Sequence, residues 1–426
     1  MEGADRERKE AGFKVRTPVD EARRTLEEAV LDGEASDPPT GTETVPLERA
    51  DGRVLAAPVT AARNVPHYQR AAMDGYAVRA ADTFGASDRS PEVLRIGDRD
   101  GSVGPGTAVR VHTGSALPDG ADAVVMIEYV EELEDLGELE VGDAVAEGEN
   151  VAPVGEDVEE GRRLYDAGHR LRPSDLGLLR SVGYTRLEVA QRSTVGVIPT
   201  GEELVEGDPG PGEVIETNGL TVSRMVDRWD GRSTYRDVVT DDAESLRVAI
   251  QRDLTKDVVV TTGGSSVGER DLLPEVIDEL GEVIVHGVGL KPGHPVCLGV
   301  VEETPVLALP GYPVACIVNA VQFLRPTLRW LEGTTPEPHP TTQAVLERKI
   351  PSEPGTRTFA RVQLEERDEA DLERGEPAYR ATPTRASGSG VLSSVALADG
   401  WVVVDDEREG IPEGETVAVQ DWEPNA

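Results

Sequence analysis

Two glycine-containing segments of the chain combine residues that bind anions with residues that bind cations. Residues 200–203 (TGEE) and 261–271 (TTGGSSVGERD) each follow a strand-like run rich in Val, Ile and Thr. Glycine lets backbone N–H groups approach an anion, and a helix N-terminus behind such a loop favours negative charge. A tight strand-to-helix turn explains the Gly-Gly pair equally well, so these segments alone leave both interpretations open.

Lys291, in the segment LKPGHP at residues 290–295, is one of only five lysines in the chain. Lysines are rare in this chain, and this one lies between Gly289 and Gly293. Its position favours a role in neutralising a phosphate or oxyanion. The alternative is a solvated charge on a loop. Glu203 and Asp271 have two interpretations of equal weight. They are charges that complement a helix dipole, or oxygen ligands of a hard cation such as Mg²⁺.

These segments belong to an alternation of strands and amphipathic helices over residues 191–332, a central α/β domain. The pattern predicts a central, mostly parallel α/β/α sandwich, in which ligands bind beyond the carboxyl ends of the strands. The loops that we expect at these strand ends are 200–203, 261–271, 291–295 and 310–313. The strand-like runs are 194–199, 234–239, 258–262, 283–288, 296–301 and 306–309.

Shorter β-like runs between Gly and Pro surround this central domain. They predict a β-rich N-terminal insertion and a small C-terminal β domain, with a helix over 17–31 and a second one near 174–182. The expected domains are an extended N-terminal domain at 15–60 and 146–190, an inserted small β domain at 61–145, and the C-terminal β domain at 341–426. The β-like runs of the insertion are 107–113, 123–127 and 144–151.

The charge of the chain is extreme, with 43 Lys and Arg against 81 Asp and Glu and a formal net charge of −38. Acid-rich, lysine-poor chains are typical of organisms with a salt-filled cytoplasm, so we expect a halophilic archaeal source, the alternative being an acidic mesophilic protein. The charge argues against nucleic acid as a partner. Cys297 and Cys316, the two cysteines, allow no disulfide framework or cysteine-based zinc site.

No run of apolar residues approaches the roughly 18 that a membrane span requires, and the first residues have no apolar core typical of a signal peptide. The sequence therefore predicts a cytoplasmic protein without a membrane partner.

Several segments, in their order and spacing, resemble the molybdopterin molybdenumtransferase family, which includes the E domain of gephyrin. The resemblance extends over about residues 17–420, and the combination of AMDGYAV, TGGSSVGERD and KPG in one chain is highly specific to it. The segments are AMDGYAV (72–78), HTGSALPDGADAVVM (112–126), GEDV (155–158), TGEEL (200–204), TNG (217–219), TTGGSSVGERD (261–271), LKPGHP (290–295), PGYPVA (310–315) and SGSGVLSS (387–394).

The resemblance implies an activity that composition does not show. Members of this family take adenylylated molybdopterin and molybdate, or tungstate, hydrolyse the adenylyl phosphoanhydride and release AMP. The resemblance further implies a need for Mg²⁺, a homodimer, and possible contact with the adenylyltransferase of the same pathway. A phosphoanhydride is negatively charged, so its cleavage benefits from a cation, a lysine and backbone donors.

Matching the family position by position implies three sets of site residues. The catalytic set is Asp74, Asp157, Glu203, Asp271 and Lys291. The substrate-binding set is Thr113, Thr217, Gly263, Gly264, Ser265, Ser266, His294, Pro310 and Ser389. The cation-binding set is Glu203, Asp241 and Asp271, with Asp242 as an alternative to its neighbour Asp241.

The chain departs from the common family pattern at three places. His294 stands where many members have a second lysine, Tyr312 where many have asparagine, and 152–154 (APV) where basic residues often precede GED. These three replacements bear on which side chains neutralise the charge of the anionic ligand.

Two alternatives remain beside the transferase: the molybdopterin adenylyltransferase that makes the substrate, and a non-catalytic scaffold related to gephyrin. The β domains flanking the central domain argue against the first, which is typically a single domain. A scaffold has no need of Asp74, Asp271 and Lys291 together.

Overall fold

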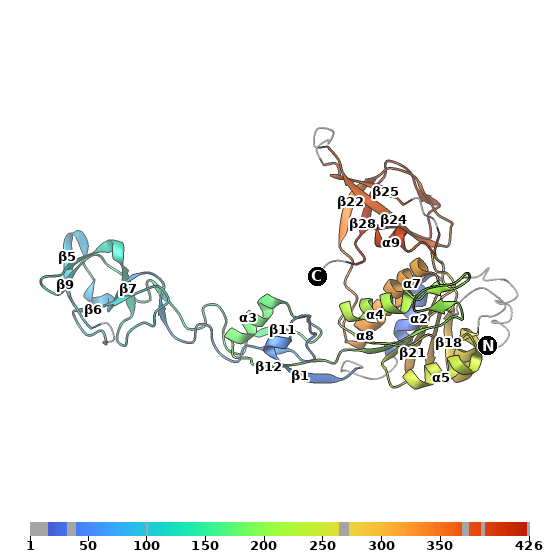
Figure 1. Cartoon of the computed structure of the whole chain (residues 1–426). Helices are drawn as coiled ribbons and strands as arrows, with labels where there is room; N and C mark the ends of the chain where they lie inside the picture. The colour runs from blue at the N-terminus through green and yellow to red at the C-terminus, as the bar shows by residue number, and fades with distance from the viewer. Residues whose placement is uncertain are drawn as a thin grey trace. The chain divides into compact units, whose positions relative to one another are not determined.

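The computed structural model describes residues 16–31, 40–98, 101–263, 272–368, 375–384 and 388–423. The chain divides into two compact units, which are Met1–Glu43 with Ala190–Ala426, and Thr44–Val189. Figure 1 shows the helices and strands of both units.

A six-stranded sheet with the order β16-β13-β17-β21-β20-β18 forms the centre of the first unit. Strands β16, β13, β17 and β21 are mutually parallel, β20 is antiparallel to β21, and β18 is antiparallel to β20. This arrangement confirms the mostly parallel sheet expected for the central domain. The strands are Arg232–Tyr235 (β16), Thr194–Pro199 (β13), Val258–Thr262 (β17), Thr304–Leu309 (β21), Cys297–Val301 (β20) and Glu282–His286 (β18).

Helices cover both faces of this sheet because successive side chains of its buried strands point to opposite faces. Val258 and Val260 of β17 pack into a core with α2, α4, α7 and α8, whereas Val259 packs into a second core with α5 and α6. The helices are Val19–Leu31 (α2), Asn218–Arg228 (α4), Ala243–Asp253 (α5), Leu273–Leu280 (α6), Pro313–Asn319 (α7) and Arg325–Leu331 (α8).

The helix expected over 17–31 is confirmed as α2. A π-helical turn, η4 (Ala320–Leu324), joins α7 to α8 just before Pro326. Proline has no N–H to donate, and its ring crowds the preceding turn of a helix. Pro326 therefore explains why the helix widens into a π-helical turn at this place.

The C-terminal part of the first unit is a closed β-barrel. Its strands β24, β25, β22, β28 and β26 pair in that order, and β26 pairs again with β24. The short strand β19 (Leu290–Lys291), which comes from the central domain, pairs in parallel with β24. The barrel strands are Thr341–Leu346 (β22), Arg357–Glu366 (β24), Tyr379–Pro383 (β25), Gly400–Val404 (β26) and Thr416–Gln420 (β28); the other elements are Ile350–Pro351 (β23), Ser393–Ala396 (α9) and Gly410–Ile411 (β27).

The second unit contains a six-stranded sheet with the order β7-β4-β6-β5-β9-β8. Its strands are Ala123–Met126 (β7), Gly75–Val78 (β4), Thr107–Val111 (β6), Ser87–Ile96 (β5), Glu138–Asp143 (β9) and Val130–Leu133 (β8). The strand expected over 144–151 is wrong, because Gly148 and Asn150 adopt positive φ angles of 82° and 56° and turn the chain. Only Val151–Ala152 (β10) is extended there.

Short strand pairs, one α-helix and the 3-10 turns Leu47–Arg49, Ala80–Asp82 and Ile127–Tyr129 also belong to this part of the chain. The pairs are β1 with β12, β2 with β11 and β3 with β10. Their remaining bounds are Thr42–Pro46 (β1), Val59–Thr60 (β2), Arg70–Ala71 (β3), Arg163–Tyr165 (β11), Pro173–Ser181 (α3) and Arg186–Ala190 (β12). The finer division into an extended domain and an insertion at 61–145 stays a prediction.

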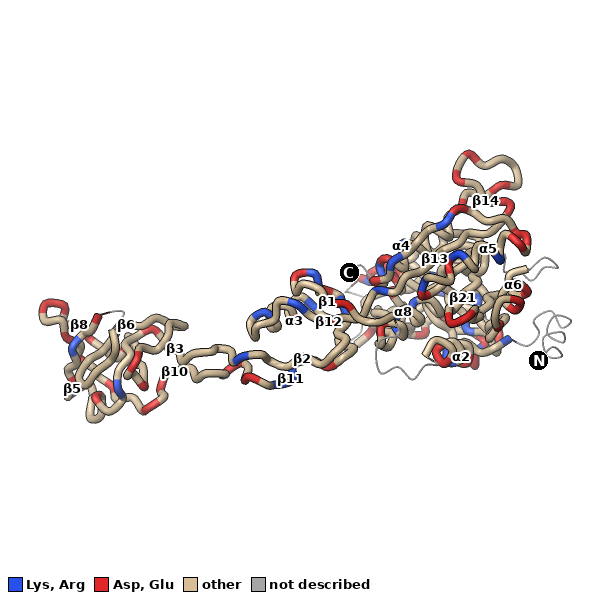
Figure 2. The backbone as a smooth tube through the Cα atoms, turned by 90° about the horizontal axis from the view of Figure 1, so that it is seen from below, with Lys and Arg blue, Asp and Glu red and all other residues tan. Residues whose placement is uncertain are grey.

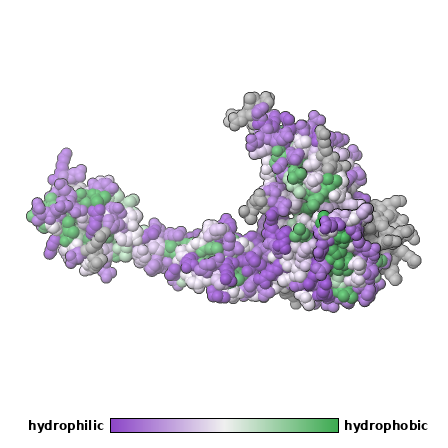
Figure 3. Space-filling model, in the orientation of Figure 1, coloured by the Kyte–Doolittle hydropathy of each residue, from purple (hydrophilic) through white to green (hydrophobic). Residues whose placement is uncertain are grey.

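Acidic residues are spread over both units. Figure 2 shows Asp and Glu along every part of the described chain, with Lys and Arg interspersed among them. On the face drawn in Figure 3, hydrophilic residues cover most of the surface and hydrophobic residues form small patches. None of the described helices combines the length and apolar character that a bilayer crossing requires.

Candidate active site

The carboxyl ends of the parallel strands bring several loops to one edge of the central sheet. Residues after β13, β17 and β21 leave the sheet at this edge, and a bridge between Thr200 and Val239 extends it towards the loop that follows β16. The segment that precedes β20 reaches the same edge, since β20 is antiparallel to β21 and Cys297 pairs with Ala308. The convergence expected from the sequence is therefore present.

These loops and one segment of the barrel domain surround a cavity of about 810 Å³. Its size lies within the range of cavities that hold a small organic ligand. The lining residues are Glu202, Glu203, Leu204, Val214, Asp241, Gly263, Gly293, His294, Pro295, Pro310, Gly311, Tyr312, Pro313, Ala315, Ser389 and Gly390.

Three carboxylates face this cavity. Burial raises the pKa of Asp241, and the like charges of Glu203 and Glu202 raise it further. The buried Oδ1 atom of Asp241 has no hydrogen-bond partner among the described residues. A buried carboxylate oxygen without a donor, next to two more carboxylates, is stabilised by a bound cation.

Asp241 and Asp242, which the sequence cannot distinguish, have different surroundings. The carboxylate of Asp242 caps α5, accepting hydrogen bonds from the Ser245 N–H at 2.9 Å and the Thr240 hydroxyl at 2.7 Å. These bonds lower the pKa of Asp242 to about 2. The structure thus gives Asp242 a local role as a helix cap and leaves Asp241 for the cavity.

Gly263 brings backbone directly to the floor of the cavity. Its φ is +131°, and a Cβ at this position would lie 2.1 Å from the carbonyl oxygen of Thr200, so only glycine fits. The buried hydroxyls of Thr200, Thr261 and Thr262 have no hydrogen-bond partner in the described part of the chain. These three hydroxyls are buried beside the glycine turn, and their residues are not among those that line the cavity.

The turn at 310–313 is held by contacts from two directions. The Asn218 side chain donates a hydrogen bond from Nδ2 to the Gly311 carbonyl at 2.7 Å. The Val314 N–H, at the start of α7, donates to the Ser389 carbonyl at 2.9 Å and so brings the barrel segment to the cavity. Tyr312 is 65% exposed although it lines the cavity, which makes its ring available for stacking on a planar ligand.

His294 lines the cavity on a loop anchored to α7. Asn319 donates from Nδ2 to the carbonyls of Gly293 at 3.0 Å and Ala315 at 2.8 Å. Burial lowers the pKa of His294, and the positive charge of Arg16 lowers it further. The imidazole is therefore neutral near pH 7 in the free protein, unlike the lysine common at this position in the family.

The cavity brings together six of the residues predicted from the sequence: Glu203, Asp241, Gly263, His294, Pro310 and Ser389. Lys291 and Thr217 are not among its lining residues, and the Lys291 ammonium lies 3.3 Å from the Glu353 carboxylate. Gly264, Ser265, Ser266 and Asp271 lie outside the described residues.

Asp74, Thr113 and Asp157 belong to the second unit. The Asp74 carboxylate accepts hydrogen bonds from the Thr113 N–H at 2.7 Å and hydroxyl at 2.9 Å. These bonds lower the pKa of Asp74, so it is ionised near neutral pH. Asp157 is exposed, and its N–H donates to the Val65 carbonyl at 3.0 Å.

Sequence reasoning missed two residues of the site. Glu202 lines the cavity beside Glu203, and Asn218 orients the 310–313 turn. Both stand inside segments that the sequence had marked, TGEEL and TNG, but the pattern gave no reason to choose them over Glu203 and Thr217. Within the described residues no group of three or more His, Cys, Asp or Glu has metal-binding proximity, so Asp271 stays a predicted third ligand.

A mostly parallel sheet with a glycine turn and carboxylates beside a cavity at its strand ends defines an α/β protein of the ligand-binding type. Known domains cover most of the chain. Residues 17–183 match the MoeA N-terminal region (domain I and II), 196–330 match a probable molybdopterin binding domain, and 343–422 match the MoeA C-terminal region (domain IV). The chain belongs to the molybdopterin molybdenumtransferase family.

Relatives of similar length support this assignment. A putative molybdopterin biosynthesis protein of Methanocaldococcus jannaschii is 36% identical, over 88% of this chain and 91% of that protein. The molybdopterin molybdenumtransferase of Bacillus subtilis is 32% identical, over 94% of this chain and 93% of the relative. The solved structure of a molybdopterin biosynthesis MoeA protein from Pyrococcus horikoshii is 33% identical with a TM-score of 0.80, covering 96% of this chain and 100% of that one.

Replacing Asn218 by Ala is expected to raise the KM of the enzyme for its substrate about tenfold, because the 310–313 turn loses the side-chain bond to Gly311 that orients it. Steady-state kinetics on the purified variant measure the effect. Leu220→Ala, an exposed change on the same helix, is the matched control and should leave KM unchanged. Equal KM values for wild type and Asn218→Ala would contradict the positioning role.

Proposed function

We propose that this protein inserts molybdate, or tungstate, into adenylylated molybdopterin, with hydrolysis of the adenylyl phosphoanhydride and release of AMP. The observation that carries the proposal is the cavity that combines Glu203 and Asp241 with Gly263 and Ser389. A phosphoanhydride and an oxyanion both require positive charge and hydrogen-bond donors around them. The side chains of Ser389, Tyr312 and His294, which line the cavity, are the proposed donors.

Mg²⁺ is the cation that fits these residues best. Asp241 and Glu203 offer hard oxygen ligands. Burial raises the pKa of Asp241, and the charges of Glu203 and Glu202 raise it further, a repulsion that a divalent cation would reduce. When bound, Mg²⁺ supplies positive charge that stabilises the leaving phosphate. Asp241 and Glu203 would hold the ion, and Asp271 is the proposed third ligand.

The proposal includes a cytoplasmic homodimer that receives its substrate from the adenylyltransferase of the pathway. It includes roles for Asp74, Thr113 and Asp157 in the same reaction, for which the ionised state of Asp74 is suitable. Light scattering coupled to size-exclusion chromatography tests the dimer, with a mass near twice 45.6 kDa as the expected result.

The central experiment measures AMP release from adenylylated molybdopterin with Mg²⁺ and either molybdate or tungstate. We expect AMP to be released in a reaction that depends on both the oxyanion and Mg²⁺. Absence of AMP release with either oxyanion would favour the scaffold alternative. Production of adenylylated molybdopterin from molybdopterin and ATP would favour the adenylyltransferase alternative instead. The ratio of rates with the two oxyanions identifies the preferred one.

The affinity for the anionic substrate is expected to weaken as pH rises, through His294. Burial and Arg16 lower the pKa of the free imidazole, whereas a bound anion favours the protonated form and raises that pKa. Binding therefore takes up a proton between the two pKa values, and the protonated fraction is lost as pH rises through the pKa of the complex. His294→Lys should flatten this dependence and bind more tightly at alkaline pH.

Measurements of KM from about pH 5.5 to 8.5 check this expectation for wild type, His294→Lys and His294→Ala. The alanine variant should lose affinity most at low pH. Parallel profiles for all three proteins would show that the imidazole carries no charge that the ligand senses.

A further inference from the structure

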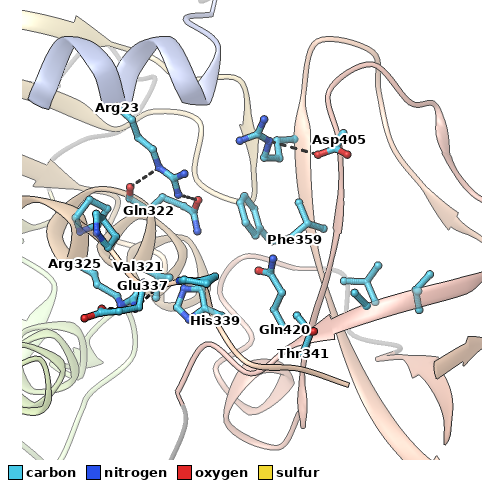
Figure 4. A pocket seen from close by; sticks show the side chains of 18 of the residues that line it. Arg23, Val321, Gln322, Arg325, Glu337, His339, Thr341, Phe359, Asp405 and Gln420 are labelled. Atoms are coloured by element: carbon cyan, nitrogen blue, oxygen red, sulfur yellow. Dashed lines mark hydrogen bonds and ion pairs between the residues drawn. The ribbon is translucent and has the colours of Figure 1, made fainter. Parts of the chain in front are cut away.

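A second cavity, of about 680 Å³, lies in the first unit between helices α2 and α8 and the barrel. It shares no lining residue with the candidate active site. Figure 4 shows Arg23, Gln322 and Arg325 on the helical side, with Phe359, Thr341 and Gln420 opposite them. Four arginines line this cavity, Arg23, Arg325, Arg357 and Arg408, although the chain has nearly twice as many acidic as basic residues.

Two of these arginines are neutralised by carboxylates close by. Arg408 forms two hydrogen bonds of 2.9 Å to Glu415, and Arg357 forms bonds of 2.7 and 2.8 Å to Asp20. Arg325 donates to the Glu337 carbonyl at 2.8 Å and lies 3.4 Å from its carboxylate. Glu337 is shared, because Arg329 also donates to its carboxylate, at 3.3 Å.

Arg23 has a different environment. Its hydrogen bonds within the described residues go to the carbonyl and amide oxygens of Gln322, which are neutral, the first at 3.0 Å. Burial lowers the pKa of Arg23, and the like charges of Arg357 and Arg325 lower it further against the opposing effect of Asp20. Arg23 therefore has no carboxylate partner within ion-pair distance among the described residues.

Two further basic groups line this cavity, Arg357 and His339. The buried Nε of Arg357 has no hydrogen-bond partner among the described residues, and the Asp405 carboxylate is 4.0 Å away. Burial lowers the pKa of His339 to about 4, and Arg325 and Arg23 contribute to the shift. Arg357 is itself compensated, because its hydrogen bonds to Asp20 and the charges of Asp406 and Asp405 raise its pKa. Arg23 is thus the arginine of this cavity whose hydrogen bonds go to neutral oxygens.

We propose that this cavity is a second binding site, for a phosphate group that is either free or carried by a small metabolite. Guanidinium groups match the oxygens of phosphate in geometry and form paired, charge-assisted hydrogen bonds with them. Arg23, Arg325 and Arg357 come from α2, α8 and β24, so three separate parts of the first unit converge on the ligand. The site is distinct from the proposed catalytic cavity and does not depend on its chemistry.

Isothermal titration calorimetry of the full chain with inorganic phosphate, at constant ionic strength in potassium chloride, tests the site. We expect saturable binding that Arg23→Gln weakens at least about tenfold, since a charged hydrogen-bonding pair is lost. Arg224→Gln is the matched control, because Arg224 is on α4 and 67% exposed, and should bind phosphate as wild type does. Melting temperatures without phosphate verify that the folds are equal.

Competition with AMP distinguishes the two sources of the phosphate group. Displacement of phosphate from the Arg23-dependent site indicates a phosphorylated metabolite, whereas no displacement indicates the free anion. Arg23→Lys keeps the positive charge but loses the paired hydrogen bonds of the guanidinium group. It replaces Arg23→Gln in this test if that variant does not fold. We expect Arg23→Lys to bind phosphate several-fold more weakly than wild type. Phosphate binding no stronger than that of chloride, or affinity unaffected by the Arg23 substitutions, would overturn the proposal.

Discussion

Replacing Asp241 by Asn or Glu203 by Gln is expected to reduce AMP release at least about 100-fold, because each change removes a charged oxygen ligand from the proposed cation site. The metal-free Asp241→Asn protein should at the same time melt at a higher temperature than wild type near neutral pH. Asp241 has a raised pKa, so its ionised form destabilises the folded state. That destabilisation is absent at low pH and develops as pH rises through the raised pKa.

AMP release, together with melting temperatures at about pH 4 and pH 7.5 with and without Mg²⁺, checks both parts. Asp242→Asn is the matched control, one residue away, since asparagine also caps a helix and Asp242 serves α5. It should keep activity and the melting-temperature increase caused by Mg²⁺, which the Asp241 variant should lose. Near-normal AMP release by either Asp241→Asn or Glu203→Gln would refute the metal-binding role of that residue.

Lowering potassium chloride from about 2 M to 0.1 M is expected to reduce the melting temperature by at least about 10 °C. With a net charge of −38, the folded chain repels itself. The screening length grows from about 3 Å at 1 M salt to about 10 Å at 0.1 M, so each acid then senses more of its neighbours. Calorimetry across a potassium chloride series measures the effect, and a flat or falling curve with added salt would contradict adaptation to high salt.

The effect of salt on repulsion between acidic residues can also be tested at a single pair of glutamates. Glu131 on β8 is directly opposite Glu140 on β9, where like charges destabilise an antiparallel pair. Glu131→Lys should therefore raise the melting temperature of the second unit at 0.1 M salt, and much less at 2 M. Glu131→Gln, which removes the repulsion without adding attraction, should have an intermediate effect. Equal gains at both salt concentrations would exclude screening as the cause.

The sequence predicted the central domain well because its signals are local. The β-branched run of β17, Val258–Thr262, has the bounds expected from the sequence, and the helix α2 begins two residues inside its expected range. The edge at which ligands bind follows from strand direction alone. Glu203, Gly263 and His294 were placed at this edge on the basis of their loops, and they line the cavity.

Other features depend on contacts between residues that are distant in the chain. The closure of the barrel rests on pairing of β24 with β26, and the position of Ser389 rests on its bond to Val314. The choice between Asp241 and Asp242 was beyond the sequence, because two adjacent aspartates differ only in which one reaches the N–H groups of α5. Lys291 was assigned to the ligand from its rarity and from the family resemblance, and this assignment stays a prediction. In the structure its strand pairs with β24 and its ammonium lies near the Glu353 carboxylate.

The barrel domain is joined at two places to the segments that line the candidate cavity. Its strand β24 takes Leu290–Lys291 as a neighbour, directly ahead of the loop that carries His294, and its Ser389 carbonyl accepts from the first turn of α7. A change in the orientation of the barrel would therefore move both of these segments together. Without the barrel, the loop that carries His294 would lose the pairing of Leu290–Lys291 with β24, and the start of α7 would lose its hydrogen bond to Ser389.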